Sequence, residues 1–146
     1  MSRPMPVPVD VAELAARVLR RQLGAHTDPP ATGVQVSTEV GRGRDGGPPS
    51  LPWLLVAVDG HTWQWPAIQR ATLRLTAWHH TEHAAVALVG LALGVLCNPA
   101  TATGALISAE PNTGPVAGTD PYTGEPLATA NAVLLVRTPA RRPGPG

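Results

Sequence analysis

The run from Ala84 to Cys97 constrains the fold most, because it contains no charged residue. At about 1.5 Å of rise per residue, a helix of this length is too short for a bilayer, which needs about 20 apolar residues. A helix that is apolar on all sides must be covered on several of them. The run therefore predicts a core helix around which the rest of the chain packs.

The segment before this run alternates with a period of two residues, which is typical of a strand with one buried face. Between Ala67 and Trp78, one face is apolar (Ala71, Leu73, Leu75, Ala77) and the other is polar (Arg70, Thr72, Arg74, Thr76). We expect the strand to lie in a sheet and the apolar helix to lie back across it.

One stripe of the apolar helix is small, since Ala87, Gly90 and Gly94 recur at helical spacing. Glycine inside a helix costs about 1 kcal/mol relative to alanine, so its presence needs a reason. A small stripe lets another backbone approach closely. That backbone belongs either to the same subunit or to a neighbouring subunit, and the sequence leaves both interpretations open.

Length and charge limit the function classes. The 146 residues suit one domain, which we place at residues 10–138, after an extended, proline-rich segment (residues 1–9) and before a disordered tail (residues 139–146). The net charge is +1, all eleven basic residues are arginines, and they form no basic patch of the kind that nucleic acids require. The single cysteine, Cys97, cannot form an internal disulfide, and no signal peptide is expected.

The remaining elements complete the predicted order α-β-β-β-α-β-β. Asp10 caps a helix that runs to Gly24, with Glu13 at capping-box spacing. Strands are expected at Gly33–Val40, Leu51–Gly60, Ala105–Ala109 and Leu127–Thr138; the first two of these could form a hairpin. Asp59-Gly60 is expected to begin a turn, and Glu110–Pro126 a long loop. The order predicts an α+β fold, with an antiparallel or mixed sheet of about five strands and two helices packed on one face.

The sequence HHTEH, His79 to His83, is the first candidate for chemistry. His79 and His83 are four residues apart, as in helical zinc sites, but Glu82 is misplaced for the metalloprotease motif, and a third ligand would have to come from His26 or His61. Thr81 and Glu82 equally suit a helix start. We predict no metal, no other cofactor and no catalytic residue; a small metal-dependent enzyme using His79, His80 and His83 is the alternative.

Two further features are candidates for contacts with other molecules. The segment Gly41–Ser50 has four glycines and two prolines, which predicts a projecting, mobile loop whose Arg42 and Arg44 face DNA or a neighbouring subunit. Trp63 and Trp65 lie in an expected turn and point the same way if extended. Clustered surface aromatics favour a protein interface, whereas half-buried packing explains them equally well.

The chain resembles the tail terminator proteins of long-tailed bacteriophages, especially phages of actinobacteria. The resemblance begins at the helix capped by Asp10 and includes a strand, ATLRLTAWHHTEHAA, that runs into an alanine-rich helix. It continues through a strand at Ile107–Glu110, Gly114-Pro115, the turn DPYTGEP at Asp120–Pro126 and a final strand at Leu127–Thr138. It covers nearly the whole chain and rests on architecture rather than on a catalytic signature.

The resemblance implies a structural virion protein without enzymatic activity. Members of the family form a hexameric ring on the head-proximal end of the tail tube, where the ring stops tube polymerisation and presents a surface to the head-completion or stopper protein. Genomic DNA passes through the lumen without sequence-specific binding, and no membrane is involved. The protein is then expected in the host cytoplasm during assembly and in the virion neck afterwards. Another neck, tail-completion or head–tail connector protein is the alternative within the same class.

Overall fold

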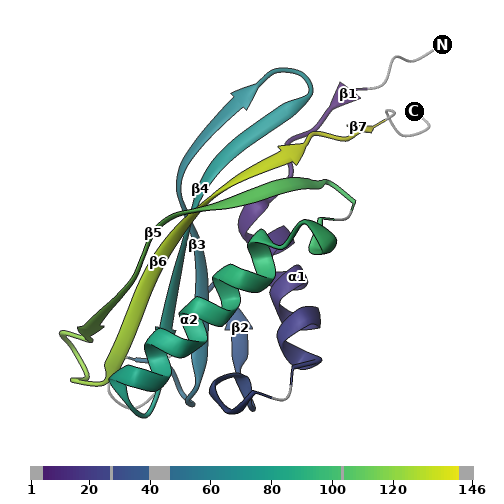
Figure 1. Cartoon of the computed structure of the whole chain (residues 1–146). Coiled ribbons are helices and arrows are strands. Elements are labelled where there is room, and N and C mark those ends of the chain that lie inside the picture. Colours follow the sequence, from purple (N-terminus) through teal and green to yellow (C-terminus); the bar gives the residue numbers. More distant parts are fainter. Residues whose placement is uncertain (1–4, 27, 40–46, 103, 142–146) are drawn as a thin grey trace.

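The computed structural model describes residues 5–26, 28–39, 47–102 and 104–141. Both helices cover one face of a five-stranded mixed sheet with the strand order β2-β3-β4-β6-β5 (Figure 1). This arrangement confirms the predicted α+β class. The sheet strands are β2 (Gln35–Ser37), β3 (Trp53–Gln64), β4 (Ile68–Trp78), β5 (Leu106–Thr119) and β6 (Pro126–Arg137), and the helices are α1 (Val11–Gly24) and α2 (Glu82–Cys97).

The core lies between the helices and the central strands. Antiparallel register places Val56 of β3, Leu75 of β4 and Ala130 of β6 side by side on the covered face. All three are buried, as are their neighbours two residues away along β4, Leu73 and Ala77. The alternation in the sequence therefore assigned the buried face of β4 correctly.

Helix α2 begins and ends where its sequence permits. The Thr81 side chain accepts a hydrogen bond from the Ala84 amide at 3.0 Å, which satisfies one of the free N–H groups at a helix start. The helix ends at Cys97, with Asn98 as its C-cap before Pro99. It packs on β6, β5, β4 and α1. In the described part of the chain, no helix is long and apolar enough to span a membrane.

Helix α1 is capped as predicted. The Asp10 carboxylate accepts a hydrogen bond from the Glu13 amide at 3.1 Å. The Glu13 carboxylate binds Arg20 at 3.1 Å and lies 3.6 Å from Arg17. The buried side of the helix, which includes Leu19 and Leu23, packs over β2, β3 and α2.

The predicted hairpin between the first two strands is wrong. Strand β2 pairs with β3 in parallel, with Gln35 opposite Trp53. The connection between Ser37 and Trp53 is long enough for the chain to return to the end of the sheet at which β2 began, so that β3 starts there too. Alternation indicates which face of a strand is buried but not which way the strand runs, so the sequence pattern could not decide this point.

The expected turn at Asp59-Gly60 is also wrong. These residues lie inside β3, where the register with β4 shifts between Val58 and Gly60. Such a bulge accommodates an extra residue without ending the strand. Asp59 forms an ion pair across the two strands, because its carboxylate lies 3.3 Å from the Arg74 guanidinium of β4. The turn comes later, at residues 65–67, and the β3–β4 hairpin extends past both helices (Figure 1).

Strand β5 replaces most of the loop predicted at Glu110–Pro126. The strand runs to Thr119, and only residues 120–125 form the turn into β6. Three register shifts interrupt its pairing with β6. Strand β5 is an edge strand, where prolines such as Pro111 and Pro115 are tolerated because a missing N–H costs no ladder bond on the free side.

Two short segments near the ends of the described chain form a second, two-stranded sheet. Strand β1 (Met5–Pro6) pairs with β7 (Ala140–Arg141), so the tail predicted to be disordered from residue 139 is ordered at least to Arg141. Residues 142–146 lie outside the described part, as do residues 41–46 with Arg42 and Arg44. The predicted mobility of the Gly41–Ser50 loop is thus untested there, whereas Gly47 and Pro48 at its end are buried.

Candidate assembly surfaces

The tip of the β3–β4 hairpin carries the two predicted tryptophans in different environments. Trp65 lies in the turn and is 70% exposed. Trp63, at the end of β3, is half-buried, and its indole N–H is buried without a hydrogen-bond partner among the described residues. The two rings therefore do not form one exposed cluster. The interpretation as half-buried packing applies to Trp63. For Trp65, a contact with another protein stays a prediction.

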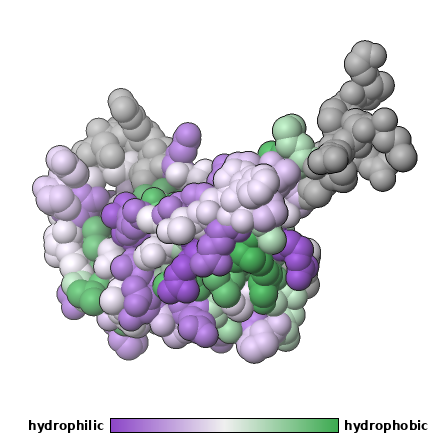
Figure 2. Space-filling view, turned by 90° about the horizontal axis from the view of Figure 1, so that it is seen from above, coloured by the Kyte–Doolittle hydropathy of each residue, from purple (hydrophilic) through white to green (hydrophobic). Residues whose placement is uncertain are grey.

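Backbone hydrogen bonds hold the base of this tip. The Ala67 amide donates to the Gln64 carbonyl at 3.2 Å, and the Thr138 amide donates to the Ala67 carbonyl at 2.7 Å. Trp65 is consequently presented by an anchored turn. Figure 2 looks down on this end of the molecule and shows one larger apolar patch bordered by hydrophilic groups, with smaller apolar areas elsewhere on the same face.

The small stripe of α2 is divided between two environments. A Cβ at Gly90 would lie 3.8 Å from the Pro115 ring of β5, an ordinary contact, so this part of the stripe is packed within the subunit. Ala87 is half-buried, whereas Gly94 is exposed, and a Cβ there would have nothing within 4 Å. At Gly90, the interpretation that the small stripe packs within the subunit is thus confirmed. The Gly94 end of the stripe is uncovered and remains available to a partner.

Strand β5 is an exposed edge that the sequence analysis missed. Every residue from Glu110 to Ala117 is exposed, including Val116 at 60%. The covered surface of the sheet lies on the helix side, and no helix of the described chain lies on the opposite face, where Leu55, Thr129 and Leu135 are half-buried.

The turn between β5 and β6 is held by hydrogen bonds to the Asp120 side chain and presents a second exposed aromatic. The Asp120 carboxylate is buried and accepts hydrogen bonds from the Trp78 indole at 2.7 Å, the Tyr122 amide at 2.8 Å and the Thr123 amide at 3.2 Å. The Tyr122 side chain is 88% exposed. An Asp that binds amides two and three residues on is typical of such turns, so the motif DPYTG could have indicated this presentation.

The environment of Asp120 predicts an acid-sensitive contribution to stability. Desolvation raises the pKa of Asp120, but the hydrogen bonds from Trp78, Tyr122 and Thr123 outweigh it and hold the pKa below the ordinary value of 3.8. The unfolded chain therefore takes up this proton first as the pH falls. The contribution of the Asp120 carboxylate to the stability of the fold is complete above the ordinary pKa of 3.8. It is lost as the pH drops through the lower pKa of Asp120 in the folded state.

Urea unfolding between about pH 5 and pH 2 measures this contribution. We expect the free energy of unfolding of Asp120→Asn to fall less steeply than that of wild type as the pH is lowered over this range. Asp28→Asn, at an exposed carboxylate whose Oδ2 lies 3.5 Å from the His26 Nδ1, is the control and should retain the wild-type slope. Equal slopes for wild type and Asp120→Asn would contradict the assignment.

The histidines are arranged differently from a helical metal pair. Helix α2 starts at Glu82, so His79 precedes the cap and does not share a helix face with His83. The His79 Nε2 donates to the Pro30 carbonyl at 3.1 Å, and its Nδ1 accepts from the His80 amide at 2.8 Å. Both ring nitrogens of this buried histidine are thus engaged within the fold. The described residues contain no group of three potential metal ligands.

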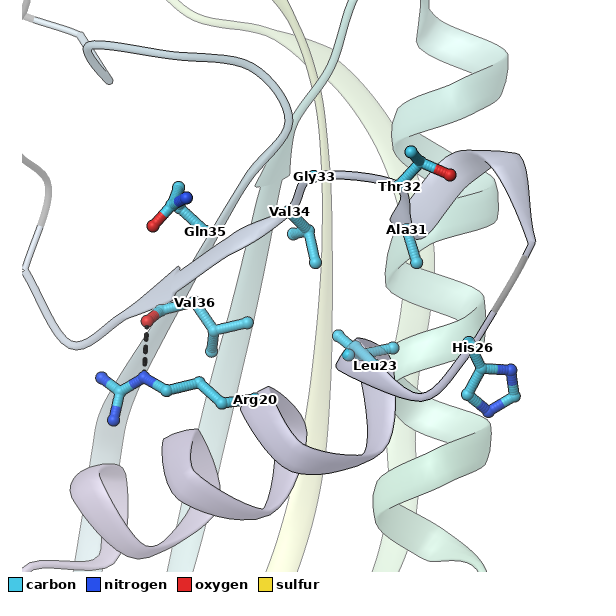
Figure 3. A pocket seen from close by; sticks show the side chains of 10 residues that line it. Arg20, Leu23, His26, Ala31, Thr32, Gly33, Val34, Gln35 and Val36 are labelled. Atoms are coloured by element: carbon cyan, nitrogen blue, oxygen red, sulfur yellow. Dashed lines mark hydrogen bonds between the residues drawn. The ribbon is translucent and has the colours of Figure 1, made fainter.

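A cavity of about 610 Å³ lies between the end of α1 and β2 (Figure 3). Its floor is apolar, with Leu23, Val34 and Val36, and the Arg20 Nε donates to the Val36 carbonyl at 2.9 Å. His26 and Gln35 lie at opposite sides of it in Figure 3. Among the described residues that line the cavity, the polar groups therefore do not converge on one point.

No protein-family model matches this chain, and a search of curated proteins gave no significant match.

Proposed function

We propose that this chain is a structural subunit of a phage tail terminator ring. The observation that carries the proposal is the resemblance in the order and sequence of elements from the Asp10 cap to the final strand near Thr138. In this role the protein is not an enzyme. Its partners are copies of itself in a ring, the tail tube protein below and a head-completion or stopper protein above, and genomic DNA passes through the lumen.

Three surface features support an assembly role. The β3–β4 hairpin presents Trp65 beyond the helices, β5 is a long exposed edge strand, and α2 leaves Gly94 uncovered. Exposed aromatic side chains and uncovered apolar surface are typical of protein interfaces. The engagement of His79 within the fold favours this role over the metal-dependent enzyme that uses His79, His80 and His83.

A terminator works by having two unlike faces. One face must bind the end of the growing tube more tightly than the next tube subunit does, and the other must offer no equivalent docking surface. Heterologous contacts that close into a ring produce this polarity, because every subunit points the same way along the axis. The subunit therefore needs no catalytic group, only self-complementary side surfaces and two different ends.

Deletion of the gene tests the proposal. We expect tails of uncontrolled length that fail to join heads, with complementation by the wild-type gene restoring both tail length and joining. Electron microscopy of lysates measures both. Tails of normal length attached to full heads after the deletion would show that the proposal is wrong, and tails of normal length without heads would favour another neck protein.

A further inference from the structure

Gln69 is a buried amide at the end of the sheet that carries the hairpin. It lies on β4 with 1% of its surface exposed. Its Oε1 accepts from the Val9 amide at 2.7 Å and from the Thr138 hydroxyl at 3.4 Å. Its Nε2 donates to the Val9 carbonyl at 3.0 Å and contacts the His61 Nε2 at 2.9 Å. One side chain thus binds the N-terminal segment to both strands of the hairpin.

The Val9 backbone fixes the orientation of this amide. Its N–H can only donate and its carbonyl can only accept, so the Gln69 oxygen must face the former and the nitrogen the latter. A flipped amide would place like groups together at both contacts. The second hydrogen of the Gln69 Nε2 therefore points to His61, whose Nε2 must accept it. Only the neutral imidazole with its proton on Nδ1 can do so.

The segment held by Gln69 is a strap, residues 5–9, that joins the terminal sheet to α1. Met5 pairs with Arg141, the Val7 amide donates to the Pro139 carbonyl at 3.2 Å, and Val9 binds Gln69 just before the Asp10 cap. Pro6 and Pro8 have no N–H to donate. The strap therefore depends on few bonds among the described residues, and the pair at Gln69 is partly buried.

We propose that His61 and Gln69 form a pH-sensitive latch on this strap, closed while the His61 ring is neutral and loosened when it is protonated. Protonation puts a hydrogen on His61 Nε2, so the 2.9 Å contact becomes donor to donor. The bond from Gln69 to His61 is therefore made with the neutral ring and is lost when the ring takes up a proton.

The charged groups of the neighbouring elements do not offer a replacement partner. Asp10 caps α1, and Asp59, two residues before His61 on β3, is paired with Arg74. Arg70 on β4 and Arg137 on β6 are neighbours in sequence of the buried Gln69 and Val136, so strand alternation points them to the other face of the sheet. Arg17 of α1 lies near the Glu13 carboxylate.

Amide exchange of the Val9 N–H tests the latch, with the His61 ring titration followed by NMR on the same sample. We expect the protection factor of Val9 to fall roughly two- to tenfold as the ring becomes protonated, which is the effect of losing one supporting hydrogen bond. The protection factor of Leu88, buried in α2, should not change over the same range.

Two variants make the result specific. His61→Gln keeps a neutral acceptor without a titration, so Val9 protection should become independent of pH. His83→Gln changes an exposed histidine of α2 and should retain the wild-type behaviour. The same pH dependence in His61→Gln, unchanged Val9 protection as the ring titrates, no measurable Val9 protection at any pH, or a parallel loss at Leu88 would each overturn the proposal. The experiment uses the isolated chain and is independent of the tail terminator role.

Discussion

Gly114→Ala is expected to destabilise the fold more than any other single methyl addition among the described glycines. Gly114 has a φ of +85° in β5, and a Cβ there would lie 2.6 Å from the Thr129 carbonyl oxygen and 2.9 Å from the Ala130 Cα. Both atoms belong to the backbone of β6, which is held between β4 and β5 and under α2. Strand β6 therefore cannot move aside without breaking its pairing with β4, although Gly114 itself lies in the register shift between Thr113 and Val116 of edge strand β5.

The expected loss combines two costs. The left-handed backbone conformation costs about 1–2 kcal/mol for an alanine, and overpacking against an immobile neighbour costs about 1–3 kcal/mol. Their sum is a large fraction of the roughly 5–15 kcal/mol that stabilises a typical domain. Urea or thermal unfolding of the purified variant measures the loss, and failure to fold at all is the extreme form of the same result.

Gly124→Ala separates the two costs. Gly124 has a φ of +74°, but a Cβ there would have nothing within 4 Å. This variant should lose only the backbone component, so its unfolding midpoint should lie between those of wild type and Gly114→Ala. Equal losses at the two positions would mean that β6 yields to the added methyl group.

Local patterns in the sequence predicted the covered face and the helix ends because each depends on a few neighbouring residues. Alternation placed Leu73 and Leu75 in the core, and the side chains of Asp10 and Thr81 bind the amides that a cap should bind. These features need no knowledge of what lies elsewhere in the chain. The fold class followed, because the apolar helix had to be covered by a sheet.

Long-range pairing could not be predicted in the same way. The direction of β2 depends on the path of the connection to β3, and the length of β5 depends on its being an edge strand that tolerates Pro111 and Pro115. Both properties are set by the assembled sheet. The sequence pattern of β5, rich in glycine and proline, is locally that of a loop.

The candidate surfaces were partly predictable for the same reason. Trp65 was identified because an aromatic side chain in a turn is conspicuous, but the burial of Trp63 depends on the bulge in β3. Tyr122 was missed, although the local turn in which the Asp120 carboxylate accepts from the Tyr122 and Thr123 amides could have indicated its exposure. The sequence predicted one environment for all small residues of the α2 stripe. In the fold, Pro115 lies beside Gly90 and not beside Gly94, which the sequence pattern could not indicate.

Gly94→Arg is expected to abolish assembly while leaving the subunit folded. The residue is helical and exposed, and a Cβ there meets nothing within 4 Å, so an arginine side chain can extend into solvent. Arginine also favours a helix interior over glycine by up to about 1 kcal/mol, so the free subunit should be slightly more stable. Between subunits, the same side chain would separate two backbones that the small residue allows to approach, and it would add a charge to an uncharged helix surface.

Two variants define the comparison for Gly94→Arg. Gly94→Ala should raise the thermal midpoint of the free subunit by a similar small amount and reduce assembly less, because a methyl group adds little bulk. Gly24→Arg places the same side chain at the end of α1, at a glycine whose Cβ would also meet nothing within 4 Å, and should assemble as wild type does. Light scattering with and without tail tubes measures assembly, since a ring that forms only on the tube would be missed in the free protein. If Gly94→Arg assembles on tubes as well as wild type, the open end of the α2 stripe is not a subunit contact, and the glycine has no role beyond the folded subunit.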